Sequence, residues 1–367
     1  MNAETPEQGR TLSGESLLGE TADRLLTARC DPETVRQAEA IGWDDTLWGE
    51  VAGAGFPWIG LSGDGSGGTL LDTAEILHRC GRYGVPLPVA ETGMIGGWML
   101  QRAGVGLPDG PVTVPVPHPD DEVELSRRDG GWHIGARFHR VPWASNAARI
   151  VFAVSNGTGA EHIVSVDVGD NVQPARNLAG EPRDTVEIGT TLSAASVTEV
   201  PPGTAQQVRR RGALSRALLI AGALERSSEL ATAYARERQQ FGQVIARFQA
   251  VQQHLVLAAE HASAASIAAW TAAAAVMEND DDPHHKVAIA RAVAHDSVNV
   301  VTARTHQVFG AIGMTKEHEL HLRTRRAWAW TEEWGTGQYW AEQLGGDLLV
   351  GGADELWATL ASGSVRS

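Results

Sequence analysis

Cysteine is scarce in this chain of 367 residues, which contains only Cys30 and Cys80. The two lie far apart and have no C-x-x-C or Cys/His ligand spacing, so the sequence predicts neither a disulfide framework nor a metal site. We expect both thiols to be reduced, as in cytoplasmic proteins.

A targeting segment and a long apolar run are also lacking. Residues 1–10 are polar and acidic, unlike the basic start and apolar stretch of a signal peptide. No later apolar run is long and charge-free enough to span a bilayer. The sequence therefore predicts a cytoplasmic protein that does not associate with membranes.

Positive charge is in short supply. The chain has 30 Lys and Arg against 45 Asp and Glu, a formal charge of −15, and its basic residues gather only briefly, at 209–211 and at Arg216. Phosphate recognition needs clustered Lys and Arg. We therefore expect an acidic enzyme with no nucleic-acid partner.

The chain is long enough for two or three packed domains, and its patterning changes twice. Helical spacing of apolar residues prevails up to about Ala103, short β-branched runs follow from about Gly110, and helical spacing returns after Pro201-Pro202-Gly203. The sequence predicts an α+β fold with an N-terminal helical domain (1–108), a middle β-barrel or sandwich (109–202) and a C-terminal helical bundle (203–367).

The middle region has runs of strand length. The expected strands span residues 112–116, 122–125, 132–138, 150–154, 162–166 and 195–200. Asp129-Gly130-Gly131 is a hairpin-turn signal between the second and the third.

In the C-terminal region, apolar residues recur every three or four positions from Phe248 to Val276, which predicts one face of a long bundle helix. Asp282-Pro283 then has the pattern of an N-cap followed by proline, starting a helix through residues 285–307.

A glycine pattern offers an alternative function. Gly63-x-Gly65-x-x-Gly68 fits the dinucleotide fingerprint of NAD-dependent Rossmann enzymes. The pattern that follows is helical rather than that of a second parallel strand, so we take this as the minor alternative.

The segment from Tyr234 to Gln252 is the most informative. It is a helix carrying Arg236 and Arg238, broken at Phe241-Gly242 and restarted at Phe248. Such a turn could hold a diphosphate, because arginine presents a planar fork of donors to phosphate oxygens. An ordinary helix–loop–helix corner with a solvated arginine would have the same pattern.

Here the chain resembles the acyl-CoA dehydrogenase family. Arg238-x-x-Phe241-Gly, followed by Phe-Gln-x-x-Gln at 248–252, is similar to that family's flavin-binding signature. The block from Gln307 to Glu317 and the Leu-x-x-x-x-Arg-Arg pattern ending at Arg326 are similar to its second conserved block. The resemblance covers nearly the whole chain and implies a C-terminal four-helix bundle and noncovalent FAD.

The resemblance also implies roles for individual residues. Arg238 would meet the FAD diphosphate, Phe241 would lie against the cofactor, and Gln307 and Gly310 would reach its adenine end, usually across a subunit interface. Val141 to Ala147 resembles the strand that contacts the flavin ring, which implies Trp143 and Ser145 as contacts. The family's Thr-Glu-Pro-x-x-Gly-Ser-Asp loop is absent, and residues 115–121 stand near its place.

The family reaction is α,β-desaturation of an acyl-CoA thioester. A carboxylate removes the α-proton while a hydride passes from the β carbon to the flavin. The resemblance implies an electron acceptor such as an electron-transfer flavoprotein, and a homo- or hetero-oligomer, dimer or tetramer.

The catalytic glutamate is where the sequence departs from the family. Its usual position falls on Trp334, followed by an intact Gly335-Thr336, with Thr336 implied as a cofactor contact. The family's other location for this acid falls near Gly212. Glu333, next to Glu332, is a weak candidate base after a one-residue slip, and an exposed helix-end acid is the alternative.

Three hypotheses follow. The chain is one subunit of a heteromeric acyl-CoA dehydrogenase for bulky, steroid-like thioesters whose partner supplies the base; or a self-sufficient dehydrogenase using Glu333; or a catalytically silent flavin-binding scaffold. An oxidase or monooxygenase on the same fold also remains open.

Overall fold

The computed structural model describes residues 16–61, 67–128, 131–278 and 284–350. The N-terminal part is helical. It comprises α1 (Leu17–Arg29), α2 (Pro32–Ile41), α3 (Asp45–Gly53), the short η1 (Phe56–Trp58), α4 (Leu70–Tyr83), the π-helix η2 (Glu91–Gly97) and α5 (Trp98–Arg102). The sequence encodes these starts locally, because Ser16, Asp31, Asp44 and Thr69 cap the first turns of α1 to α4 with their side chains.

The alternative prediction, a dinucleotide-binding site at the glycine pattern of residues 63–68, is wrong. Gly63 and Gly65 lie outside the described residues, and Gly68 is followed by Thr69, which with Asp72 forms the capping box of α4. In the described part of the chain the only parallel pairing is between two strands of a β-sandwich, so no doubly wound parallel sheet exists there to carry a Rossmann site.

The middle part consists of two four-stranded sheets packed face to face. One has the order β1 (Val112–Thr113), β4 (Arg149–Ser155), β5 (Glu161–Val166) and β8 (Val197–Val200); the other has the order β2 (Glu122–Arg128), β3 (Gly131–Pro142), β7 (Arg183–Leu192) and β6 (Val172–Gln173). Ile134, Phe138, Phe152, Val164 and Val186 form the core between them. The α+β class with a middle sandwich is confirmed.

Strand β7 was not expected from the sequence, although it pairs with β3 along most of its length. The turn residues Asp129 and Gly130 lie outside the described residues, and β3 begins at Gly131. Near its other end, the pairing of β3 with β7 shifts register between Phe138 and Val141. This bulge redirects His139 and Arg140, and Arg140 has a φ of 54°.

The C-terminal helices are α6 (Thr204–Glu237), α7 (Gln249–Glu278), α8 (His284–Phe309), α9 (Leu320–Thr331) and α10 (Gly337–Val350). The expected apolar face of α7 is confirmed from Ala258 onward, because the face residues from there to the end of the helix are buried: Ala258, Ala262, Ala265, Ala269, Ala272 and Val276. Nearer its start, Val251 and Leu255 are half-buried, and Phe248 precedes the helix. The proposed cap Asp282-Pro283 lies outside the described residues. The N-terminal and C-terminal helices share one hydrophobic core, so the domain boundaries at 108 and 202 stay a prediction.

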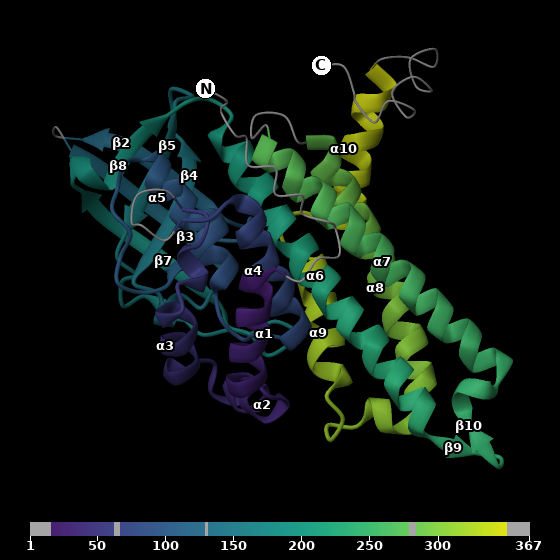
Figure 1. The fold of residues 1–367 in the computed structure, drawn as a ribbon. Helices are drawn as coiled ribbons and strands as arrows, with labels where there is room; N and C mark the ends of the chain where they lie inside the picture. Colours follow the sequence, from purple (N-terminus) through teal and green to yellow (C-terminus); the bar gives the residue numbers. More distant parts are fainter. Residues whose placement is uncertain (1–15, 62–66, 129–130, 279–283, 351–367) are drawn as a thin grey trace, which may run out of the picture.

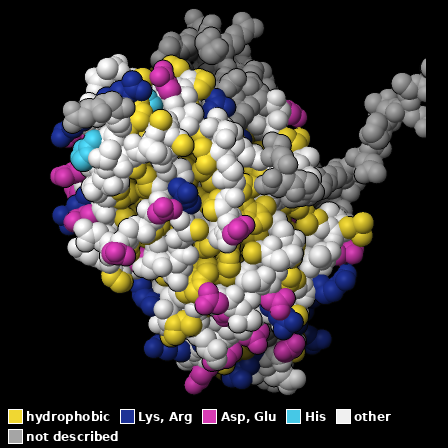
Figure 2. Space-filling model, turned by 90° about the vertical axis from the view of Figure 1, so that its left-hand side faces the viewer, with side chains coloured by type: hydrophobic (Ala, Val, Ile, Leu, Met, Phe, Trp, Pro, Cys, Tyr) yellow, Lys and Arg dark blue, Asp and Glu magenta, His cyan; other side chains and the backbone are white. Residues whose placement is uncertain are grey.

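Helix α6 connects two distant ends of the molecule (Figure 1). It begins beside the β-sandwich and ends at a small hairpin, β9 (Gln239–Gln240) and β10 (Gln243–Val244), at the far end of the bundle. On the face that carries the sandwich, the described basic side chains are interspersed with acidic ones and form no continuous basic surface (Figure 2). No helix within the described ranges is both long and apolar enough to cross a membrane.

Candidate active site and cofactor-binding end

Trp334 and Gly212, the two positions at which an acid was expected, pack against each other. Trp334 lies in the turn between α9 and α10, is 2% exposed and has a φ of 60°, a left-handed conformation that is unusual for a bulky residue. Its indole covers Gly212 on α6 so closely that a Cβ at position 212 would lie 2.0 Å from its Cδ2. The described chain therefore places an aromatic ring, not a carboxylate, between these two elements.

Glu333 is buried and fully paired. Its Oε1 accepts from Nε of Arg183 at 2.7 Å, and its Oε2 accepts from Nε of Arg216 at 2.6 Å. Burial alone would raise the pKa of this carboxyl, but the two guanidinium charges and their hydrogen bonds lower it to about 2. A carboxylate with so little affinity for a proton is poorly suited to remove one from a carbon acid.

Glu333 is part of a longer ion-pair network. Arg216 also bonds Glu91 of η2. On the other side, Arg183 bonds Glu181 at 3.1 Å, Glu181 lies 3.3 Å from Nε of Arg326, and Glu39 of α2 pairs with Arg326 and Arg325 of α9. The network joins the N-terminal helices, the sandwich and the bundle. Because carboxylates alternate with guanidinium groups along it, each buried charge has an opposite neighbour.

Arg291 of α8 fixes the turn that carries Trp334. Its Nη2 donates to the carbonyl oxygens of Thr331 (3.0 Å), Glu333 (3.0 Å) and Gly335 (2.8 Å). Burial, together with the nearby charge of Arg216, lowers its pKa to about 10. A charged group from a neighbouring helix holds this turn, so the surrounding structure stabilises the left-handed backbone conformation of Trp334.

The predicted flavin-ring contacts lie beside this network. Trp143 is buried with a φ of 46°, and the guanidinium carbon of Arg183 lies 4.9 Å from its ring centroid. The backbone N–H and hydroxyl of Ser145 both donate to Oδ2 of Asp184 at 3.2 Å. The hydroxyl oxygen of Thr336 accepts from the backbone N–H of Tyr339 at 3.1 Å. All three residues therefore have a contact within the chain, with Arg183 over the Trp143 ring, but the buried Nε1 of Trp143 has no hydrogen-bond partner among the described residues.

The other predicted cofactor contacts gather at the far end of the bundle. Arg238 is the C-cap of α6 and leads into the β9–β10 hairpin, whose two-residue turn is Phe241-Gly242. The ring stack of Tyr234 on Phe309, with centroids 4.6 Å apart, joins this end of α6 to the end of α8. Gln307 and Gly310 are therefore in the neighbourhood of Arg238.

These contacts are available to a ligand. The Phe241 side chain is 92% exposed and its φ is 52°, so a large aromatic residue is held in solvent in a strained conformation. Arg238 and Gln307 are exposed, and within the described part of the chain neither side chain has a hydrogen bond or ion pair. Guanidinium, aromatic and amide groups suit a diphosphate and an adenine ring. The hairpin end of the bundle therefore fits part of FAD. At the predicted flavin-ring contacts, by contrast, the Arg183 guanidinium lies over the ring of Trp143.

The two groups of predicted residues do not meet within one chain. Gly212 and Arg238 are separated by 26 residues of α6 and its cap, which at 1.5 Å per residue is about 40 Å. Figure 1 shows the sandwich and the hairpin at opposite ends of the molecule. The two kinds of contact therefore belong to opposite ends of this chain.

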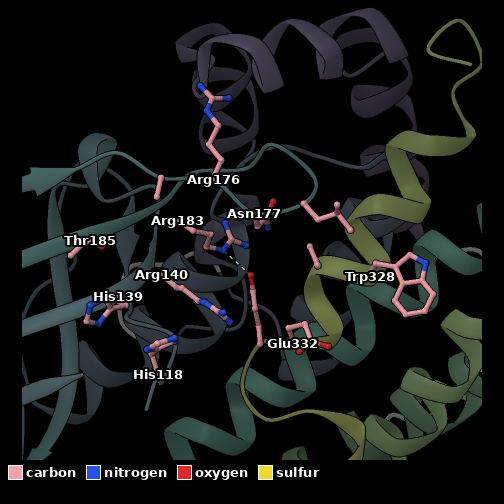
Figure 3. A pocket seen from close by; sticks show the side chains of 13 residues that line it. His118, His139, Arg140, Arg176, Asn177, Arg183, Thr185, Trp328 and Glu332 are labelled. Atoms are coloured by element: carbon pink, nitrogen blue, oxygen red, sulfur yellow. Dashed lines mark hydrogen bonds and ion pairs between the residues drawn. The ribbon is translucent and has the colours of Figure 1, made fainter. Parts of the chain in front are cut away.

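A cavity of about 550 Å³ opens between the sandwich and α9 (Figure 3). His118, His139, Arg140 and Arg183 line its sandwich side, and Trp328 and Glu332 line its α9 side. Glu333 also lines the cavity and is paired with Arg183 at 2.7 Å.

Sequence reasoning missed most of the buried network. Arg183, Arg291 and Glu181 were not singled out. Glu91 was noted only as an acid downstream of the glycine pattern, and Arg216 only as part of a basic cluster. Arg216 had the clearest signal, because it interrupts the otherwise apolar and small-residue run of residues 212–224.

Comparison with known proteins agrees with this geometry. Residues 204–348 match the family described as acyl-CoA dehydrogenase, C-terminal domain. The acyl-CoA dehydrogenase IpdE2 of Mycolicibacterium smegmatis is 28% identical over 322 residues, which cover 85% of this chain and 91% of that protein. The chain is therefore similar to acyl-CoA dehydrogenases over most of its length, and its residues 204–348 match that family's C-terminal domain.

Solved structures show the same fold. The ChsE4–ChsE5 complex of Mycobacterium tuberculosis contains a chain with a TM-score of 0.83 at 22% identity, covering 92% of this chain and 99% of that one. A variant of the Tcur3481-Tcur3483 steroid ACAD matches with a TM-score of 0.80 at 20% identity, covering 94% of this chain and all of that one.

Proposed function

We propose that this chain is the base-lacking subunit of a heteromeric, FAD-dependent acyl-CoA dehydrogenase. A partner subunit supplies the carboxylate that removes the α-proton, and this chain contributes the hairpin end of its bundle to the cofactor site. FAD, when bound, supplies the acceptor for the hydride that leaves the β carbon. The reduced enzyme passes its electrons to an acceptor such as an electron-transfer flavoprotein.

The contact of Trp334 with Gly212 carries this proposal. The indole nitrogen only donates, so Trp334 cannot accept the α-proton in any environment. The ring also fills the space next to Gly212, so the alternative position is closed as well as neutral. Glu333 holds two arginine side chains together, and removing its charge would leave both of them buried without their shared partner.

The chain's own residues have a clear task at the hairpin end. Arg238 pairs with phosphate oxygens, Phe241 packs on the cofactor, and Gln307 and Gly310 meet its adenine end. The exposure and strain of Phe241 support this, because a solvent-facing aromatic ring in a left-handed turn costs stability unless something outside the chain covers it.

The predicted ring contacts Trp143, Ser145 and Thr336 stay a prediction, and the geometry disfavours it. Trp143 is 3% exposed and the Arg183 guanidinium lies over its ring, so a flavin ring against Trp143 would require the surrounding side chains to rearrange. We therefore place the flavin ring of the working site in the partner subunit.

The relatives support a proposal for the substrate class. A steroid ACAD and a ChsE4–ChsE5 complex share the fold, and an acyl-CoA dehydrogenase, IpdE2, shares more than a quarter of its residues. We propose a bulky, steroid-type acyl chain on the thioester bound by the partner.

The test is to produce the chain alone and together with a candidate partner, an acyl-CoA dehydrogenase-like chain that carries the family's catalytic glutamate. Alone, it should retain little flavin and be inactive on acyl-CoA thioesters with an artificial electron acceptor; together, both properties should appear. Within the complex, Arg238→Ala should lower flavin affinity by about 2–4 kcal/mol, because phosphate charge loses a charge-assisted partner. Arg247→Ala, an exposed arginine beyond the same hairpin, is the matched control and should change little.

The silent-scaffold alternative gives a different result. If this chain only supports the partner, flavin occupancy and activity of the complex will be the same with Arg238→Ala as with Arg247→Ala. Homomeric protein that desaturates an acyl-CoA at an ordinary enzymatic rate would overturn both proposals.

A further inference from the structure

Two histidines and an aspartate converge at the rim of the cavity between the sandwich and α9. One candidate ligand atom from each of His118, Asp121 and His139 lies within 4.8 Å of the others. In the described part of the chain this is the one such group of histidine, cysteine and acidic residues. The sequence has no spacing motif for this group, because its members come from the loop before β2 and from the later part of β3.

The β2–β3 pairing brings these residues together. Glu122, at the start of β2, is opposite Arg137 on β3, so the loop that ends at Asp121 lies beside His139. The bulge after Phe138 then redirects the His139 side chain toward the cavity. Residues 115–121 stand near the place of the family's loop that is absent here, and the proposed cofactor site uses none of their side chains.

Asp121 holds both histidines in place. Its Oδ1 accepts from the backbone N–H of His139 at 2.7 Å, and its Oδ2 accepts from the backbone N–H of His118 at 2.8 Å. The two imidazole rings lie with their centroids 5.2 Å apart. Each carboxylate oxygen keeps a second lone pair, so the aspartate can still bind a cation.

One pair of the group has the spacing of two ligands on a tetrahedral ion. Two ligands about 2.1 Å from a tetrahedral Zn²⁺ lie about 3.4 Å from each other. Nδ1 of His139 lies 3.3 Å from Oδ1 of Asp121. The same distance also suits a plain hydrogen bond, so the third ligand decides between the two interpretations.

His118 is the third member of the group, because one of its ring nitrogens lies within 4.8 Å of the ligand atoms of Asp121 and His139. Its Nδ1 lies 3.2 Å from the backbone nitrogen of Asp120, which donates to it, and 3.7 Å from Oδ2 of Asp120. The tautomer protonated on Nδ1 directs that proton to the carboxylate and leaves Nε2 for the metal, the arrangement that commonly orients ligand histidines. Asp120 is exposed, so water can accept its backbone N–H in that state.

We propose that His118, Asp121 and His139 bind one divalent transition-metal ion such as Zn²⁺, with a coordination position open to the cavity. Three protein ligands plus an open position is the composition of zinc sites that bind an exchangeable ligand. Both histidines line the cavity, and the adjacent Arg140 side chain extends into it (Figure 3). Within the described residues Arg140 has no hydrogen bond or ion pair, so it can pair with a carboxylate or phosphate oxygen bound to the ion.

The first experiment measures metal binding by tag-free protein, in the complex if the chain requires its partner. Wild-type protein should bind one Zn²⁺ per chain, and Co²⁺ in its place should give the visible absorption of a tetrahedral site. His118→Ala and His139→Gln should each weaken binding by at least about 100-fold, as expected for losing a ligand when losing even its outer partner costs 10- to 100-fold.

His133→Ala is the matched control, because this histidine is on the same strand β3 but outside the cluster, and its affinity should match the wild type. Circular dichroism of each variant establishes that the sandwich is folded. Stoichiometric Zn²⁺ binding that persists in both cluster variants, or that is lost equally in His133→Ala, would overturn the site. Because flavin content is not part of this readout, the result is independent of the proposed function.

The second experiment titrates acetate into the Co²⁺-loaded protein. The visible spectrum should change as acetate binds, and Arg140→Gln should raise the acetate concentration required. A spectrum that acetate leaves unchanged would mean that the ion has no position open to the cavity.

Discussion

The indole of Trp334 leaves no room for a side chain at Gly212, since a Cβ there would fall 2.0 Å from Cδ2. Gly212→Ala should therefore destabilise the protein by about 1–3 kcal/mol, the usual cost of overpacking a core, as measured by urea unfolding. Gly49→Ala is the control, because a Cβ added to this helical glycine would have no neighbouring atom within 4 Å outside its own helix turn. Alanine there should be neutral or stabilising by up to about 1 kcal/mol.

The same contact predicts a coupling. In a Trp334→Leu background the ring is gone, so Gly212→Ala should cost less than half of what it costs in the wild type. An equal cost in both backgrounds would show that the indole does not lie on Gly212.

Glu333 should matter for stability rather than for proton transfer. Glu333→Gln removes the charge shared by Arg183 and Arg216, and breaking a buried pair typically costs about 3–5 kcal/mol. Glu332→Gln changes an exposed neighbour and should stay within about 0.5 kcal/mol. The self-sufficient hypothesis would instead predict activity in the homomer that Glu333→Gln abolishes without loss of stability.

The same residue sets a dependence on pH. The pKa of Glu333 is about 2 in the folded protein and 4.5 in an unperturbed chain, so its contribution is present above pH 4.5 and is lost as pH falls toward 2. A shift of this size corresponds to about 3 kcal/mol. The unfolding free energy of Glu333→Gln, measured from about pH 6 down to about pH 3, should fall less steeply than that of the wild type. If the unfolding free energies of the two proteins fell equally with pH, the assignment of this pH dependence to Glu333 would be wrong.

Much of this fold is readable from the sequence because its signals are local. The apolar spacing of α7 and four of the N-terminal caps need only neighbouring residues. Strand β7 was missed because it starts with Arg183 and Asp184, charged residues that usually indicate solvent. Their burial depends on partners far along the chain, Glu333 for Arg183 and the Ser145 turn for Asp184.

The candidate site, too, could be predicted from the sequence only in part. The resemblance indicated both the hairpin end and the absence of an acid at Trp334. It gave no sign that Trp334 packs on Gly212 or that Glu333 is neutralised by two arginines, because those facts require α6, β7 and the α9–α10 turn to be placed in space.

Gln307 should link cofactor retention to assembly. If the adenine end of the cofactor lies across a subunit interface, Gln307→Ala in the complex should lower flavin retention and make the oligomer dissociate at lower dilution, as followed by absorbance and analytical ultracentrifugation. Asn299→Ala, also exposed on α8 but two turns earlier, is the control. A flavin-loaded stable monomer would contradict this.

At Phe241, a substitution that makes the isolated chain more stable should lower the flavin affinity of the complex. Its φ of 52° costs about 1–2 kcal/mol for a non-glycine residue, and its ring is 92% exposed in the isolated chain. Phe241→Gly removes the strain and adds unfolded-state entropy of about 0.4–1 kcal/mol, so the isolated chain should become more stable by up to about 1 kcal/mol. Phe241→Ala keeps the strain and should leave stability nearly unchanged. In the complex with the partner, both variants lack the ring and should lose flavin affinity to a similar extent. A ring that served only the chain's own packing would give the opposite pattern, with both variants less stable and flavin affinity unaltered.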